Sequence, residues 1–312
     1  MRARAVLLAG IAALFLAALP ARAWDDIGHQ VIARIAWDNM KPEAREKAVT
    51  LLLSAPPDAD LASLFPQDGR PISVRERELF QKAATWPDIV RDEAFPERRS
   101  KYHHSTWHFT NFFWEQDENG RPRDVTRLQP LPENVAERLA LFEDTLADPA
   151  RSPAERAVDL AWVLHLGGDI HQPLHASARV TATEPEGDRG GNLFKLDGDH
   201  NLHGYWDGIL TRTFRRRWFE DKQERIERIA RVIQQHHPRE SFAERLLPGQ
   251  FEAWAREGFE TSKSLVYVGV ERGREPSRAY RNAAFNAAEP AAALAGYRLA
   301  EMLDRLLGSG TD

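Results

Sequence analysis

The sequence predicts an all-α protein: a single domain of many helices joined by long loops, with very little β structure. Three observations indicate this class. Apolar residues recur with helical periodicity along most of the chain, several of these stretches begin at a proline or a capping residue, and strand-like stretches are few. No low-complexity linker or internal repeat divides the 312 residues, a length sufficient for one large domain with a substantial core.

The first 23 residues have the features of a secretory signal peptide. A short basic start precedes an apolar run over residues 5–20, and Ala21-Arg22-Ala23 matches an A-x-A cleavage signal. The run is short for a transmembrane helix, which needs about 20 apolar residues, although an uncleaved anchor is the alternative. We therefore expect an exported protein, periplasmic or secreted, whose mature domain covers residues 24–312.

Composition limits both the stabilising chemistry and the partners. There is no cysteine, so the exported fold must be stable without disulfides, and any metal site must use His, Asp, Glu or backbone groups. Such ligands suit zinc and, less well, manganese or iron. The whole chain carries a charge of −5, and the first 23 residues contribute three arginines and no acid, so the mature chain carries −8. This charge argues against gripping duplex phosphates by electrostatics alone, but not against an enzyme whose positive field comes from metal ions.

Helical periodicity and prolines at first-turn positions mark the helices of the N-terminal half. The expected helices cover residues 27–40, 43–54 after Pro42, 76–84 before Pro87, and 133–146 after Pro132. Ser152-Pro-Ala-Glu155 has the pattern of a capping box. The helix that it starts is apolar on opposite sides as far as Asp169, so we expect this helix to be buried.

The C-terminal half continues as helix after one long loop. The expected helices cover residues 203–214, 218–236, 242–246, 251–267 and 280–307, the last broken or kinked near Pro290. Residues 193–196 are a short β candidate, preceded by a turn-rich loop over residues 188–192. Gly167 and Gly168 each cost about 1 kcal/mol inside the buried helix, which indicates that another backbone or a ligand comes close there.

The buried helix also carries the residues that indicate chemistry. His165 and Asp169 are four residues apart, so on a helix their side chains point the same way. A proline ends the helix and lets His175 fold back beside them, and His203 and Asp207 repeat the same spacing. Each residue alone could be a cap or a hydrogen-bonded core residue. Two such pairs on one chain predict a site for more than one metal ion, since a buried carboxylate beside a buried imidazole is costly when neither is compensated.

Four further candidate ligands lie outside these pairs: Trp24, His29, Asp88 and His108. Cleavage after residue 23 makes Trp24 the N-terminal residue, whose α-amino group and carbonyl can chelate a metal in a five-membered ring. An α-amine has a pKa near ~8, so it gives up its proton to a metal more readily than a lysine does. An aromatic residue that only packs in the core is the alternative interpretation of Trp24.

In their order and spacing, these motifs resemble those of the zinc-dependent single-strand-specific nucleases of fungi and plants, the type I nucleases, and their bacterial relatives. The matching motifs are Trp24-x4-His29, Thr85-Trp-Pro-Asp88-Ile-Val-Arg91, Trp107-His108-Phe109, His165-Leu-Gly-Gly-Asp169-Ile-His-Gln-Pro-Leu-His175, Gly190-Gly-Asn192, Asn201-Leu-His203-Gly-Tyr-Trp-Asp207 and Ala295-Gly-Tyr-Arg-Leu-Ala300. The resemblance covers essentially the whole mature chain. It implies a phospholipase C/nuclease-like helical fold and a cluster of three zinc ions that activates water.

The resemblance also implies which residues hold each zinc. The implied ligands are Asp88, His108, His165 and Asp169 for the first zinc, His175, His203 and Asp207 for the second, and His29 with the amine and carbonyl of Trp24 for the third, which Asp169 bridges to the first. All of them offer nitrogen or oxygen, as the composition requires. His171 lies within the motif but is not a ligand in the family pattern, so we expect it to support the ligands from behind.

The implied activity is hydrolysis of phosphoric ester bonds by an endonuclease that cleaves single-stranded DNA and RNA to 5′-phosphate products, with 3′-nucleotidase activity as a further option. Asp88 and Asp169 are implied to act at the catalytic centre, where Arg91 would stabilise charge on the phosphoryl oxygens. Asn192 would bind the phosphate, and Phe109 would stack an unpaired base. We expect a monomer without stable membrane association.

One position departs from the pattern. The best-known fungal members have an Asp three residues after the histidine at position 108, and it binds the base edge; here the position is Asn111, which offers a donor and an acceptor, so the base preference stays open. Zinc-dependent phospholipases C resemble the same fold and metal pattern, but their second pair typically reads His-x-x-x-Glu, unlike His203-x-x-x-Asp207. A non-catalytic exported zinc-binding protein is the remaining alternative.

Overall fold

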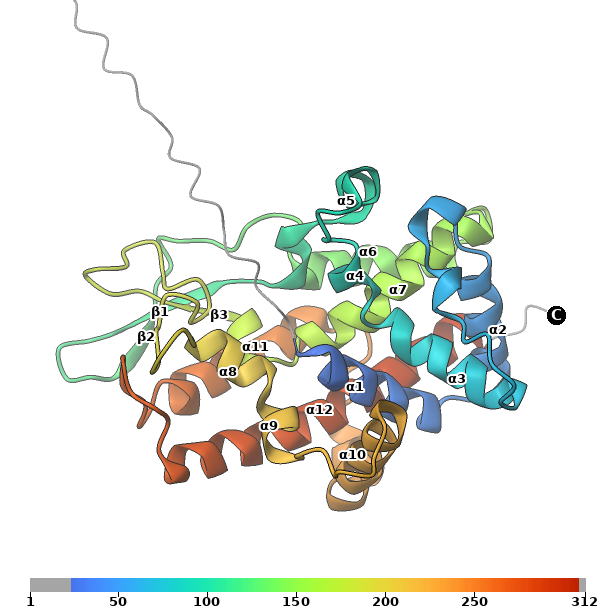
Figure 1. Cartoon of the computed structure of the whole chain (residues 1–312). Coiled ribbons are helices and arrows are strands. Elements are labelled where there is room, and N and C mark those ends of the chain that lie inside the picture. The colour runs from blue at the N-terminus through green and yellow to red at the C-terminus, as the bar shows by residue number, and fades with distance from the viewer. Residues whose placement is uncertain (1–23, 309–312) are drawn as a thin grey trace, which may run out of the picture.

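The computed structural model describes residues 24–308, so the predicted signal peptide lies outside the described part of the chain. Long helices fill the centre and right of the molecule, and three short strands gather at its left edge (Figure 1). The expected all-α class with very little β structure is confirmed. No helix within residues 24–308 is long and apolar enough to cross a membrane. The α-helices are α1 (Asp26–Asn39), α2 (Pro42–Leu53), α3 (Ile72–Ala83), α4 (Trp86–Ile89), α5 (Pro96–Tyr102), α6 (Val135–Ala147), α7 (Pro153–Asp169), α8 (Leu202–Asp207), α9 (Ile209–Thr213), α10 (Lys222–His236), α11 (Phe251–Thr261) and α12 (Arg278–Leu307).

Helix α7 occupies the centre of the fold. Ser152 and Glu155 form the predicted capping box at its start, each side chain bonding to the other's backbone N–H. Its last ten residues, 160–169, are all buried, because α2, α4, α6 and α12 pack around it. The prediction that this helix is buried is therefore confirmed, and its C-terminal end, where Asp169 lies, is held from several sides.

The two adjacent glycines of α7 allow close packing by side chains, rather than by the backbone or ligand that we expected. A Cβ on Gly167 would lie 2.4 Å from Leu299 of α12, and a Cβ on Gly168 would lie 2.9 Å from the imidazole of His29 on α1. Helices α1 and α12 also approach each other closely, since a Cβ on Gly296 would lie 2.5 Å from Ile35. These three glycines thus allow α1, α7 and α12 to pack closely at the end of α7 that carries the metal-binding motif.

Several helices begin at other residues than predicted, because a proline or a capping side chain sets the start. Helix α3 begins at Ile72, four residues before the predicted start, directly after Pro71. Helix α6 begins at Val135, because the side chain of Asn134 accepts hydrogen bonds from the first turn, while Glu133 adopts a φ of 59° that does not belong to a helix. Helix α12 runs through Pro290 without a break.

The stretch predicted as one helix over residues 203–214 forms two helices, α8 and α9, with Gly208 between them. The stretch predicted over residues 218–236 becomes helical only at Lys222, where Asp221 and Glu224 form a capping box, so residues 214–221 are a loop. The stretch predicted over residues 251–267 is α11 followed by a π-helical segment, Ser262–Val266. The stretch predicted over 242–246 belongs to a 3-10 segment, Arg239–Arg245.

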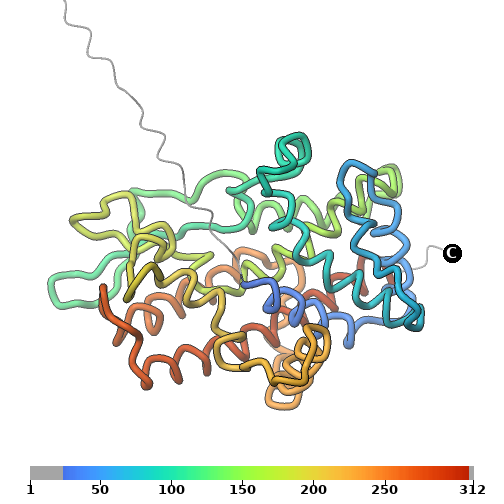
Figure 2. Tube along the Cα trace, viewed as in Figure 1, coloured from blue at the N-terminus to red at the C-terminus, as the bar shows by residue number. Residues whose placement is uncertain are grey.

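A small sheet joins two segments that carry candidate ligands. Strand β1 (Phe112–Gln116) pairs antiparallel with β2 (Pro122–Asp124) and parallel with β3 (Ser177–Arg179), so the order is β2-β1-β3 (Figure 2). The expected strand over residues 193–196 is wrong, since only Lys195 makes an isolated bridge there. Because β1 follows His108 and β3 follows His175, their pairing brings these two histidines together, and Thr110 N donates to the carbonyl of His175 at 2.7 Å.

Candidate metal centre

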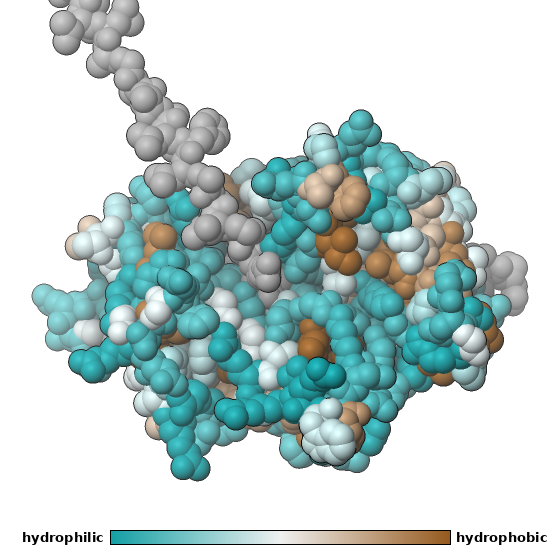
Figure 3. Space-filling view, viewed as in Figure 1, coloured by the Kyte–Doolittle hydropathy of each residue, from teal (hydrophilic) through white to brown (hydrophobic). Residues whose placement is uncertain are grey.

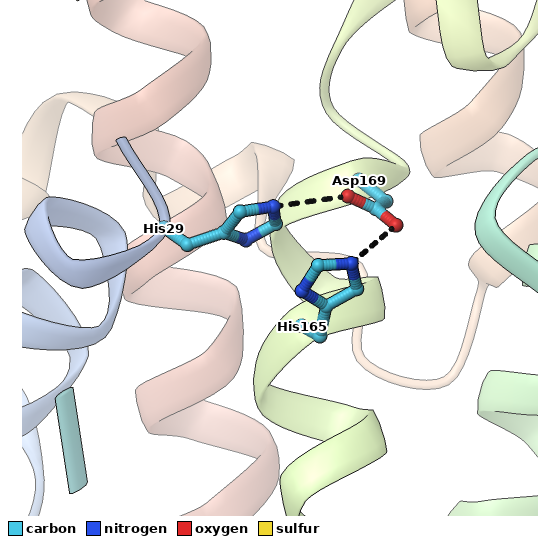
Figure 4. A group of neighbouring side chains, drawn as sticks. All are labelled: His29, His165 and Asp169. Atoms are coloured by element: carbon cyan, nitrogen blue, oxygen red, sulfur yellow. Dashed lines mark ion pairs between the residues drawn. The ribbon is translucent and has the colours of Figure 1, made fainter. Parts of the chain in front are cut away.

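Asp169, at the C-terminal end of α7, lies in the middle of the first ligand group. Its carboxylate oxygens lie 3.3 Å from Nε2 of His29, 3.2 Å from Nε2 of His165 and 3.0 Å from Nδ1 of His108. Figure 4 shows His29 and His165 approaching the carboxylate from α1 and from one turn earlier in α7. The structure therefore brings the helical pair His165 and Asp169 together with histidines from distant segments, as predicted.

Asp88 and Arg91 complete this side of the site. Asp88 lies on the short helix α4, which packs against α7 and places a carboxylate oxygen 3.8 Å from Nε2 of His165. Arg91 forms an ion pair with Asp88. The Asp88 carboxylate therefore faces the histidines and also positions Arg91. The Arg91 guanidinium can face an anion that lies over the histidines.

The second ligand group comes from the turn after α7 and from α8. His175 ends a short 3-10 segment, Pro173–His175, and His203 and Asp207 lie one turn apart on α8. Nε2 of His175 is 4.0 Å and Nε2 of His203 is 3.6 Å from the Asp207 carboxylate. The predicted second pair and the third histidine therefore converge as well.

Each of three histidines is oriented by a backbone carbonyl on the side away from the cluster. Nδ1 of His165 bonds to the carbonyl of Ala84 at 2.8 Å, Nδ1 of His175 to that of His108 at 2.6 Å, and Nδ1 of His203 to that of Gly190 at 2.7 Å. A carbonyl accepts only, so Nδ1 carries the proton and Nε2 presents its lone pair to the cluster. This is the arrangement of metal-binding histidines in proteins.

The buried atoms of the cluster are poorly compensated by the protein alone. Within residues 24–308, no hydrogen bond reaches either nitrogen of His29, Nε2 of His108, Oδ1 of Asp169 or Oδ2 of Asp207. Burial lowers the pKa of His29 to about 4 and that of His165 to about 3, and it raises the pKa of Asp169 to about 6. Nε2 of His165 lies 2.9 Å from Nδ1 of His108. Neutral imidazoles and carboxylates that face one another in this way fit divalent cations bound among them.

Within the described residues, eight of the nine predicted ligands form three groups whose ligand atoms lie within 4.8 Å of one another. The groups are His29, His165 and Asp169; Asp88, His108 and His165; and His175, His203 and Asp207. The ninth, Trp24, is fully buried, and its indole N–H donates to the carbonyl of Gly168 at 3.0 Å. Its neighbour Asp25 donates its backbone N–H to the carbonyl of Asp207 at 2.9 Å. The start of the described chain is thus fixed between both ligand groups, and coordination by its amine and carbonyl stays a prediction.

A cleft of about 780 Å³ opens over the cluster. Its lining contains Asp88, Arg91, Asn192, His203 and Asp207, five of the residues predicted to act on metal or phosphate. The amide of Asn192 is held by the carbonyl of Arg189 and by Asn201. Phe109 and Asn111 are half-buried and are not part of this lining, so their roles in base binding stay predictions.

Two residues that fix the ligands from behind, Gln172 and Arg298, were not among the predicted site residues. Gln172 is buried and donates to Oδ1 of Asp207 at 2.7 Å while its own carbonyl accepts from the backbone. Arg298 of α12 is buried and donates to Nε2 of His171 at 2.9 Å and to Glu257 at 2.7 Å. His171 therefore supports the turn between the ligands, as expected. A glutamine within the ligand motif and an arginine within an alanine-rich helix were the available signals.

Known proteins provide an independent comparison. The sequence model of the S1/P1 Nuclease family matches residues 24–308, nearly the whole chain. Among solved structures, the chain is similar to the alpha toxin of Clostridium absonum (14% identity, TM-score 0.34, covering 88% of this chain and 67% of that one) and to an alpha-toxin of Clostridium perfringens from an avian strain (13%, 0.36, 87% and 66%). The chain spans about two thirds of the length of each toxin. No curated protein matches it.

Proposed function

The chain belongs to the S1/P1 nuclease family of hydrolases that act on phosphoric ester bonds, and from this premise we propose that it is an exported, zinc-dependent endonuclease of single-stranded DNA and RNA. The observation that carries the proposal is the convergence of buried, uncompensated His and Asp atoms beneath a cleft that also contains Arg91. Products would carry 5′-phosphates, and 3′-nucleotidase activity would be a further reaction of the same site. Residues 1–23 would direct export, and the mature enzyme would be a monomer that does not bind membranes.

Three zinc ions would be held by nine residues. The proposed ligands are Asp88, His108, His165 and Asp169 for one ion; His175, His203 and Asp207 for a second; and Trp24 and His29 for a third, shared with Asp169. The two oxygens of Asp169 face different histidines, which suits a carboxylate shared by two ions. When bound, zinc supplies Lewis acidity, which lowers the pKa of water and stabilises negative charge on oxygen.

The chain's own residues would bind and orient the phosphodiester. Arg91 is fixed by Asp88 at the cleft, where its guanidinium can donate to the non-bridging phosphoryl oxygens and stabilise charge that develops on them. Asn192 faces the same cleft with an amide whose orientation is set by Arg189 and Asn201. Gln172 and the carbonyls behind the histidines keep the ligand atoms aimed at one place, so little reorganisation is needed when the substrate binds.

The depth of the ligands supports a preference for single strands. His29, His165, Asp169 and His175 are essentially inaccessible to solvent, and only Asp88 among the carboxylates of the cluster is partly exposed. A phosphate must enter the cleft to reach them, which a flexible strand does more readily than a duplex. Stacking of an unpaired base on an aromatic ring contributes about 1–3 kcal/mol; Phe109 is the proposed partner. The negative charge of the chain also disfavours duplex binding.

The test is hydrolysis of single-stranded DNA by the mature protein starting at Trp24. We expect cleavage that a chelator abolishes and added zinc restores, with 5′-phosphate on the products. Asp169→Asn is the matched variant, because it keeps the shape of the side chain but removes the negative charge that faces the histidines on both sides of Asp169. This variant should retain less zinc than the wild type. Phosphatidylcholine serves as the control substrate. Hydrolysis of the lipid but not of the nucleic acid, or inactivity of a zinc-loaded sample on both, would contradict the proposal.

A further inference from the structure

The loop between α9 and α10, residues 214–221, exposes two large aromatic side chains. Trp218 is 92% exposed and Phe219 is 62% exposed, and their rings contact each other edge to face at 5.5 Å. Both rings keep most of their surface in water, although burying an aromatic side chain is among the largest apolar gains available to a protein. An exposed pair of this kind indicates a surface that binds something.

The same segment is strongly basic. Arg215, Arg216 and Arg217 directly precede the aromatic pair, and Arg212 lies on α9 just before the loop; all four are exposed. None of the four side chains forms an ion pair with a carboxylate within residues 24–308, and Glu220 pairs instead with Arg228 of α10. On a chain with a net negative charge, this is a local concentration of exposed cations. Figure 3 shows strongly hydrophilic surface at the lower edge of this face, over α9 and α10, beside a small paler protrusion.

The loop is held in place rather than loosely attached. Arg225 donates to the carbonyls of Thr211 and Phe214, and Arg228 donates to the carbonyl of Arg215. The ring of Phe214 packs against Phe285 of α12 at 5.4 Å. The first residues of the loop are therefore fixed against α10 and α12, which lowers the entropy that binding must remove.

The loop is continuous with the cleft over the metal centre. Arg212 lines that cleft together with Asp207 and His203, and it also lines a neighbouring cavity of about 910 Å³ that contains Arg215. That cavity also contains Glu275 and Arg281, which pair with each other, and the carboxylate of Asp197. A strand leaving the cleft past Arg212 can therefore reach Arg215 through this cavity, and the exposed aromatic pair follows three residues later in the same loop.

From these observations we propose that residues 212–219 form an extended binding surface for single-stranded nucleic acid, outside the catalytic cleft. The arginines bind successive phosphates, and bases stack on Trp218 and Phe219. A positively charged surface combined with aromatic rings is the feature by which proteins bind single strands without sequence preference. The surface increases affinity for strands longer than the cleft holds and plays no part in bond cleavage. The inference rests on the proposed nuclease function for its choice of partner.

The first arm of the test measures binding without catalysis. Fluorescence anisotropy of a labelled, non-hydrolysable phosphorothioate oligonucleotide of about sixteen nucleotides, the upper end of common single-strand site sizes, gives the affinity of the zinc-loaded mature protein. We expect the double variant Trp218→Ala/Phe219→Ala and the single variant Arg215→Glu each to bind about 5- to 10-fold more weakly. Arg121→Glu changes an exposed arginine in the β1–β2 turn, at the far left of Figure 1 and away from the α9–α10 loop at the lower centre; it is the charge-matched control and should bind as the wild type does.

The second arm separates the surface from the catalytic centre. With zinc-loaded enzyme, the double variant should show a KM for the long strand raised by about the same factor, with unchanged kcat and unchanged hydrolysis of a dinucleotide, which occupies the cleft alone. Equal affinity and equal KM in wild type and double variant would overturn the proposal. So would loop-dependent binding to anionic phospholipid vesicles, or loop-dependent dimerisation, with strand affinity unchanged. A wild type that hydrolyses neither substrate would refute the nuclease function, and the binding arm would still decide this proposal.

Discussion

Replacing either glycine at the end of α7 by alanine tests how the packing of α1 and α12 sets the metal centre. Alanine is favoured over glycine in a helix by about 1 kcal/mol, but each new methyl group meets a neighbour. At position 168 the Cβ would lie 2.9 Å from Nδ1 and 3.2 Å from Cε1 of His29, and at position 167 it would lie 2.4 Å from Cδ2 of Leu299. Overpacking of this kind costs about 1–3 kcal/mol. The free energy of unfolding of each variant should therefore lie within about 2 kcal/mol of the wild-type value.

The two variants should differ in zinc binding, because only one of the displaced side chains is a proposed ligand. Gly168→Ala pushes the His29 ring away from Asp169, so zinc affinity should fall by about 10- to 100-fold, as it does when groups that orient ligands are changed. Gly167→Ala displaces Leu299 and should keep wild-type affinity. Titration against a chromophoric zinc chelator measures affinity, and urea unfolding of the metal-free proteins measures stability. Wild-type zinc affinity in Gly168→Ala, or equal loss in both variants, would refute this reasoning.

Three further substitutions probe other parts of the structure. Arg91→Ala should lower kcat about 100- to 1,000-fold, as loss of a charge-stabilising donor does, with zinc content unchanged; a normal kcat would exclude its role at the phosphate. Arg298→Met should reduce the free energy of unfolding by about 3 kcal/mol, because it leaves two acceptors, the buried Nε2 of His171 and the carbonyl of Arg245, without their donor; urea unfolding checks this. Glu220→Gln should reduce stability by about 1–2 kcal/mol at neutral pH. The Arg228 hydrogen bonds lower the pKa of Glu220 to about 2, so its contribution is present above pH 4.5 and lost as the pH falls towards 2, and wild type and variant should converge over that range.

The sequence predicted which residues converge better than it predicted the path of the chain that brings them together. Pairs four residues apart, such as His165 and Asp169, lie on one helix, so their relation follows from helix geometry alone. The convergence of His108 with His175 depends on a parallel pairing of β1 and β3, two short strands far apart in the chain. Neither strand has a long alternating pattern, so no local pattern predicts this sheet.

The predicted helix boundaries were wrong where a capping side chain, rather than helical periodicity, sets the start of the helix. Residues 218–236 have an amphipathic pattern, but the Asp221 and Glu224 capping box starts α10 four residues later than predicted. The aromatic residues before it therefore lie in a loop in water rather than on a buried face. In the same way, the apolar residues of the stretch 203–214 have the pattern of one helix, but Gly208 separates α8 from α9.

Buried partners of the ligands could not be predicted because they depend on tertiary contacts. The sequence places Arg298 in an alanine-rich helix without indicating that its guanidinium reaches His171, which is 127 positions away. Gln172 stands next to a ligand motif, yet its bond to Asp207 exists only once α8 packs against the turn after α7. Local patterns specify which side chains share a face, and packing decides which faces meet.

The most direct test of the central claim is anomalous diffraction at the zinc absorption edge from crystals of the mature protein. The account predicts zinc peaks among the atoms of Asp169, His29, His108 and His165, and a further peak between His203 and Asp207 beside His175. Crystals grown with zinc that show no anomalous peak within coordination distance of Asp169, or that show zinc only at the surface, would contradict it.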